Sequence, residues 1–135
     1  MNPNRFLYLA LFFMPMCLAC GKVSPNEDLY GVWYYDKDPD MYVKINERMY
    51  RDYLGGTHAY IDYRIRWKDK THYELTVINA VGLGNMLKEE RVVLKATIKE
   101  MTDDYCWIML EHNGRSECML LTRDRPFRGS TRSPC

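Results

Sequence analysis

The sequence predicts an all-β protein, a small antiparallel up-and-down β-barrel of about eight strands. Two observations carry this prediction. Apolar and polar side chains alternate along short runs, and turn residues such as Gly55-Gly56 and Asn113-Gly114 separate those runs. Many short strands in one small chain favour closure, because a closed barrel leaves no exposed sheet edge.

The alternation places the strands one after another along the chain. Residues 31–35 open the first strand, and residues 41–53 form a long second stretch with a bend near Asn46. The remaining strands are expected at 58–67, 72–80, 91–100, 105–111 and 116–122. In the clearest of them, one face carries Ala59, Ile61, Tyr63, Ile65 and Trp67, and the other carries Tyr60, Asp62, Arg64 and Arg66.

Residues 85–101 allow two interpretations. A helix would align Leu87, Leu94, Ile98 and Met101 on one stripe, whereas a strand would alternate Val92, Leu94, Ala96 and Ile98. The β-branched residues favour a strand from about Arg91 to Glu100, preceded by one helical turn at most.

The N-terminus has the pattern of an export signal. Residues 6–19 are an unbroken apolar run of fourteen residues after Arg5, which is shorter than the roughly twenty residues that span a bilayer. An uncleaved membrane anchor is the weaker alternative, because a single positive charge flanks the run. The segment Leu18-Ala19-Cys20-Gly21 that ends it resembles a bacterial lipobox.

This resemblance implies that residues 1–19 are a cleaved signal peptide and that Cys20 becomes the acylated first residue of the mature protein. A lipidated linker would then span 20–28, the barrel 29–125 and a flexible tail 126–135. The protein would be anchored in a bilayer of the bacterial envelope, in the outer membrane facing the periplasm.

The balance of basic and acidic residues argues against a nucleic-acid partner. Residues 1–19 contain one basic residue and no acidic one, so the remaining chain has 18 of each and no net charge. A neutral domain with interspersed signs lacks the electrostatic footprint of a nucleic-acid-binding protein.

The cysteines leave one question open. Cys106, Cys118 and Cys135 make one pair and one remaining thiol. A two-residue turn at Asn113-Gly114 would pair Met109 with Cys118 and would put Cys106 and Cys118 on opposite faces of the hairpin, which disfavours a bridge between them. Cys135 is able to reach either one.

Three short segments resemble the lipocalin and wider calycin pattern. Gly31-Val32-Trp33 is similar to the G-x-W of the first strand, Thr102-Asp103-Asp104-Tyr105 to the T-D-Y before the seventh, and Leu120-Leu121-Thr122-Arg123 to the closing segment. The resemblance implies that Arg123 packs over Trp33 by a cation–π contact and closes one end of the barrel. It also implies a small apolar or amphipathic ligand inside.

The inward faces of the expected strands give the candidate ligand lining. It consists of Val43, Ile45, Tyr53, Ile61, Tyr63, Ile65, Tyr73, Leu75 and Val77. If residues 41–53 form one continuous strand, Glu47 and Arg51 join that lining; a bend at Asn46 would turn both into solvent. The other hypothesis is a solid barrel that contacts an envelope protein through Tyr60, Arg64 and Arg66.

Catalysis is not expected. Asp36, Asp38, Asp40 and Glu47 match four positions of a calcium loop, but Met41 stands where the loop needs glycine, so a solvated acidic turn is the better interpretation. The chain has no nucleophile motif and no nucleotide fingerprint with its strand–helix setting. We therefore expect a non-enzymatic protein without metal or cofactor.

Overall fold

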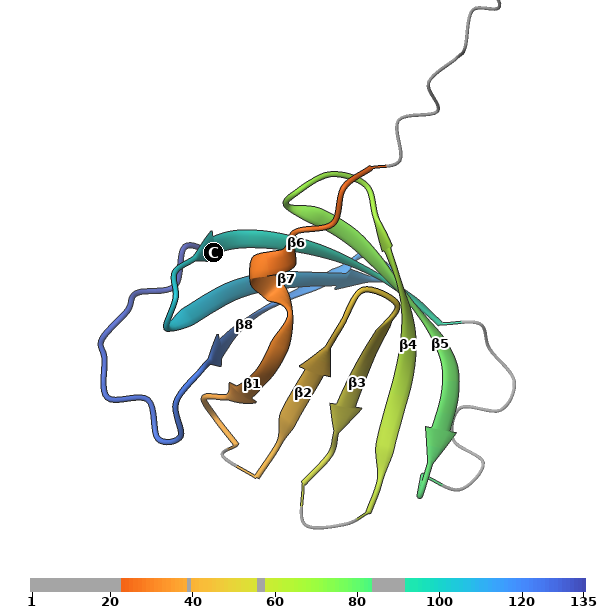
Figure 1. Ribbon diagram of the computed structural model, residues 1–135, viewed down its shortest axis with the longest axis horizontal. Coiled ribbons are helices and arrows are strands. Elements are labelled where there is room, and N and C mark those ends of the chain that lie inside the picture. The colour runs from red at the N-terminus through yellow and green to blue at the C-terminus, as the bar shows by residue number, and fades with distance from the viewer. Residues whose placement is uncertain (1–22, 39, 56–57, 84–91) are drawn as a thin grey trace, which may run out of the picture.

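The computed structural model describes residues 23–38, 40–55, 58–83 and 92–135. These residues form a closed antiparallel barrel in which β1 to β8 follow one another in chain order and β8 pairs with β1 (Figure 1). The predicted all-β barrel is confirmed. Its elements are η1 (Glu27–Leu29), β1 (Gly31–Tyr35), β2 (Tyr42–Ile45), β3 (Met49–Tyr53), β4 (Tyr60–Trp67), β5 (His72–Val81), β6 (Val93–Met101), β7 (Tyr105–His112) and β8 (Arg115–Thr122). The expected signal peptide and Cys20 lie outside the described residues.

The final hairpin forms as its turn residues predict. Asn113 and Gly114 both have positive φ values, of 50° and 74°, which is the backbone of a tight turn between twisted strands. The turn sets the register of β7 and β8, so that Met109 lies opposite Cys118 and Cys106 opposite Leu121. Cys106 and Cys118 are therefore on opposite faces of the hairpin.

The disulfide joins Cys118 to Cys135, and Cys106 is a buried free thiol. This bond ties the end of the chain to the outer face of β8. The Trp107 indole also donates a hydrogen bond to the Thr131 hydroxyl, at 3.0 Å. A cross-link and a side-chain hydrogen bond thus attach residues 126–135, the expected flexible tail, to the last hairpin.

The ambiguous segment forms a strand where the structure describes it. Residues 93–101 are β6, which pairs with β5 and β7, and the expected alternation places Ala96 and Ile98 in the core. Tertiary pairing on both sides favours the extended conformation over the helical stripe. Residues 85–91 lie outside the described residues.

One apolar cluster fills the barrel from end to end. It combines inward side chains of every strand with Leu29 of η1, which covers the end where β1 begins (Figure 1). Burial of each large side chain contributes about 1.5–3 kcal/mol. The members are Leu29, Trp33, Val43, Ile45, Tyr50, Tyr63, Ile65, Tyr73, Leu75, Ala96, Ile98, Cys106, Ile108 and Leu121.

Candidate functional site

Most of the predicted ligand lining faces the barrel interior. Six of these residues are buried in the core cluster, and two more are half-buried against it. The buried six are Val43, Ile45, Tyr63, Ile65, Tyr73 and Leu75, and the other two are Ile61 and Val77. They belong to one packed cluster, and they line none of the four best-formed surface pockets of the described residues.

The interior placement of Glu47, Arg51 and Tyr53 is wrong. A turn around Asn46 divides the expected continuous strand into β2 and β3, and the Asn46 side-chain oxygen accepts hydrogen bonds from the backbone N–H of Arg48 and Met49. The turn shifts the alternation by one residue. Arg51 and Tyr53 therefore face outward, and Glu47 is exposed in the turn. The alternative of a bend at Asn46 is the correct one for Glu47 and Arg51.

The same shift turns Tyr50 and Asp52 into the barrel. Asp52 is half-buried, and burial raises the pKa of its carboxyl to about 6, against a smaller lowering by a hydrogen bond from Tyr35. Its Oδ1 is buried without a hydrogen-bond partner. Burial also raises the pKa of Tyr50 and, to about 12, that of Tyr63. A carboxylate among tyrosines thus faces the interior, where one continuous strand would have placed Glu47 and Arg51.

The buried thiol of Cys106 is a weak nucleophile. Burial raises the pKa of Cys106 to about 12, and the positive charge of Arg123 lowers it by less. A thiol in this state is protonated at neutral pH and is a poor nucleophile. Its environment gives no support for a thiol enzyme.

Arg123 and Trp33 seal the end of the barrel under η1. The guanidinium carbon lies 3.5 Å from the centre of the indole ring, and the guanidinium donates hydrogen bonds to the carbonyls of Asp28, Tyr30 and Val32 at 2.9–3.2 Å. The indole N–H donates to the Leu29 carbonyl at 2.9 Å. These contacts hold η1 on the barrel, so both residues have a structural role here.

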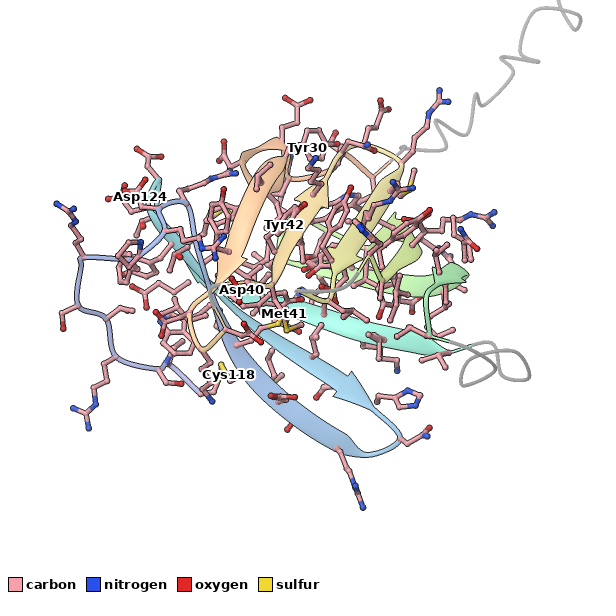
Figure 2. The ribbon with its side chains drawn as sticks, turned by 90° about the horizontal axis from the view of Figure 1, so that it is seen from below. Tyr30, Asp40, Met41, Tyr42, Cys118 and Asp124 are labelled. Atoms are coloured by element: carbon pink, nitrogen blue, oxygen red, sulfur yellow. A yellow bond between two sulfur atoms is a disulfide. The ribbon has the colours of Figure 1, made fainter. Side chains whose placement is uncertain are left out.

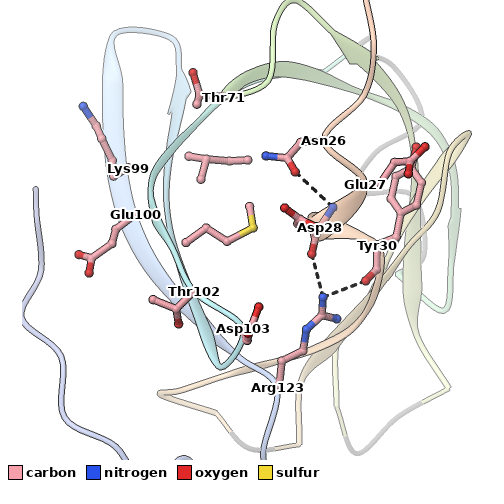
Figure 3. Close-up of a pocket in the computed structure, with 12 residues that line it drawn as sticks. Asn26, Glu27, Asp28, Tyr30, Thr71, Lys99, Glu100, Thr102, Asp103 and Arg123 are labelled. Atoms are coloured by element: carbon pink, nitrogen blue, oxygen red, sulfur yellow. Dashed lines mark hydrogen bonds between the residues drawn. The ribbon is translucent and has the colours of Figure 1, made fainter.

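A shallow polar pocket lies beside this seal, between η1 and the turn from β6 to β7 (Figure 3). Its volume is about 590 Å³. Arg123 points into the seal and donates to backbone carbonyls, as the dashed lines to Asp28 and Tyr30 show. Because these carbonyls occupy its guanidinium, Arg123 serves the seal rather than the pocket.

The outer face of β1 to β4 carries one tyrosine from each strand. Tyr34 lies opposite Tyr42, Tyr42 opposite Tyr53, and Tyr53 opposite Tyr60, so the four side chains form a continuous tyrosine row across the strands. The rings of Tyr42 and Tyr53 are stacked with centroids 4.4 Å apart, and the two outer pairs are tilted at about 6 Å. All four rings remain partly exposed.

Charged side chains form the next row on this face. Lys44 lies 5.4 Å from the Tyr53 ring centre, and the Arg51 guanidinium lies 4.2 Å from that of Tyr60. Arg51 also binds both carboxylate oxygens of Asp62, at 2.6 and 3.0 Å, which raises the pKa of Arg51. With the exposed Arg64 and Arg66 of β4, the outer face of β1 to β4 has four basic side chains and one acidic one. This face is aromatic and basic, on a chain whose formal net charge is only +1.

A third feature is a pocket at the opposite end of the barrel from η1, which we call the rim pocket. It lies between the turn from β1 to β2, residues 117–120 of β8 and the attached tail, and its volume is about 490 Å³. Met41 and Cys118 face it from two of these sides (Figure 2). Its apolar lining is Tyr35, Met41, Trp107, Leu110, Met119 and Leu120.

The described parts of the chain hold neither a candidate metal cluster nor a candidate membrane-spanning helix. No group of three or more His, Cys, Asp or Glu side chains is arranged there to hold a metal ion. No helix among those residues has the length and hydropathy needed to cross a bilayer.

Comparison with known protein families, with curated proteins and with solved structures finds no match for this chain.

Proposed function

We propose that this protein is a non-enzymatic, lipid-anchored protein of the bacterial envelope whose lipocalin-like barrel contacts another protein. The observation that carries the proposal is the tyrosine row of β1 to β4, with cations beside it. Tyrosine and arginine are the residues that dominate the binding energy of protein interfaces. The surplus of basic side chains on this face favours an acidic surface on the partner.

A filled barrel interior supports this choice. A site for a small apolar ligand requires a concave space of about 300–1,000 Å³. The predicted inward lining is instead packed into the core, with Tyr73 and Leu75 each 1% exposed. An interior ligand would have to displace these side chains, so we rank it behind protein contact.

Photo-crosslinking in the producing bacterium tests the contact. A photoreactive phenylalanine derivative at Tyr53 should give a discrete adduct of higher mass, because Tyr53 is near the middle of the tyrosine row. The matched control is the same derivative at Glu111, an exposed position on the outside of β7, across the barrel from β3. A partner held by the row should not be captured there.

A double substitution, Tyr42→Ser with Tyr53→Ser, should reduce capture by a derivative at Tyr60 about tenfold or more, because it removes the stacked pair at the centre. The folding of the variant is checked by circular dichroism. Equal adducts at Tyr53 and Glu111, or capture that survives the double substitution, would contradict the proposal.

The anchor is tested at Cys20. Cys20→Ser removes the only sulfur that the lipobox resemblance offers for acylation, so the protein should lose its lipid mass and should no longer behave as a lipid-modified protein on detergent phase separation. Cys106→Ser is the matched control, because that thiol is buried in the barrel. Lipid label retained by Cys20→Ser would refute acylation at this site.

A further inference from the structure

The rim pocket exists because β8 is longer than the strand beside it. β1 pairs with β8 only at Tyr34–Thr122 and Tyr35–Leu121, followed by one hydrogen bond from the Asp36 N–H to the Leu120 carbonyl. β7, in contrast, pairs with β8 along its whole length. From Leu120 back to its first residue, β8 therefore pairs with β7 on one side. The pocket lies along the other side.

The lining of this pocket is mostly apolar, but its charges are mostly negative. Asp36, Asp38 and Glu117 contribute three carboxylates, and Lys37 is the one cation that lines it among the described residues. All four side chains are exposed, at the edge of the pocket. Such an edge attracts a cation and repels an anion, while the apolar lining favours the binding of an apolar group.

The half-buried Asp52, behind Tyr35, adds to this negative potential. Tyr35 lines the pocket and forms a hydrogen bond with the Asp52 carboxylate, whose Oδ1 has no hydrogen-bond partner. Among the described residues, no ion pair joins Asp52 to a basic side chain. The carboxylate behind Tyr35 is therefore not neutralised by the protein.

We propose that the rim pocket binds a small amphiphile with an apolar body and a cationic head group, such as an alkyl amine or alkyl ammonium ion. The apolar body lies against Met41, Trp107 and Met119, and the head group lies among the carboxylates of Asp36, Asp38 and Glu117. A volume of about 490 Å³ is of the size that small-ligand sites have. This inference is independent of the tyrosine row, which lies on another face.

Calorimetric titration with two matched probes tests it. The full chain is reconstituted into vesicles of a zwitterionic lipid, and the heats of empty vesicles are subtracted. Octyltrimethylammonium and octanesulfonate have the same chain and opposite charges. The cation should bind about tenfold more tightly than the anion, because the pocket has three carboxylates and one amine.

Charge variants show whether this pocket is responsible. Asp36→Asn with Glu117→Gln should remove the preference for the cation, and Lys37→Gln should increase it. The Lys37 variant changes a single exposed side chain. It therefore still tests the proposal if the double variant fails to fold. Glu100→Gln, at the polar pocket beside η1, is the control and should change neither affinity.

Equal or tighter binding of the sulfonate would overturn the proposal, and so would a preference that is unchanged in both charge variants. Tyr42→Ser with Tyr53→Ser should leave the titration as it is. Loss of the protein contact and loss of amphiphile binding are thus separate results.

Discussion

Replacing Trp33 with alanine is expected to lower the free energy of unfolding by about 3–5 kcal/mol, the usual cost of removing a large aromatic side chain from a core. Trp33 is 0% exposed at the sealed end of the barrel. Its loss leaves a cavity and removes the hydrogen bond to the Leu29 carbonyl. Urea-induced unfolding followed by far-ultraviolet circular dichroism measures the change.

A double-mutant cycle isolates the contact with Arg123. Arg123→Met should cost about 2 kcal/mol on its own, because three backbone carbonyls lose their charged donor. The same change should cost about 1 kcal/mol less in the Trp33→Ala background, since the cation–π contact is then already gone. Additive costs would show that the ring and the guanidinium are not coupled, and Arg128→Met, on the exposed tail, controls for loss of charge.

Asp52→Asn is expected to stabilise the protein, and only above acid pH. The pKa of the Asp52 carboxyl is raised from 3.8 to about 6 in the folded chain, mainly by burial. A raised carboxyl pKa means that ionisation opposes folding. The penalty is absent below pH 3.8, grows between pH 3.8 and about 6, and is complete above that.

The size of this effect follows from the two pKa values. Their difference corresponds to about 3 kcal/mol, so Asp52→Asn should raise the free energy of unfolding by up to that amount at pH 7.5 and by almost nothing at pH 3.5. Chemical denaturation at the two pH values measures it. The exposed Asp103→Asn is the control. A variant that is no more stable than the native protein at pH 7.5 would show that the carboxylate is solvated or paired.

The sequence was informative wherever a local pattern determines the structure. Asn113-Gly114 specified its turn and the register of the hairpin, because few residues tolerate positive φ at both positions. Strict alternation in residues 60–67 correctly separated the inward face from the outward one. The barrel class followed from many such strands in a small chain.

The candidate sites depended on features that no local pattern contains. Whether residues 46–48 continue a strand or turn decides the facing of every residue of β3, and both arrangements fit the alternation. The tyrosine row arises from the registers of three strand pairs, which bring together residues as far apart as Tyr34 and Tyr60. The partner of Cys118 was undecided for the same reason, since Cys135 reaches it only across the surface of the folded barrel.

The bond between Cys118 and Cys135 has a practical consequence for anyone who prepares this protein. Ser133 contributes to the wall of the rim pocket, and it is held there two residues before the cross-linked cysteine. Material produced in a reducing cytoplasm, or stored with a thiol reagent, would lose the cross-link that fixes Ser133 at this pocket. Ligand screens on such material would then sample an incomplete pocket, so the oxidised form is the one to assay.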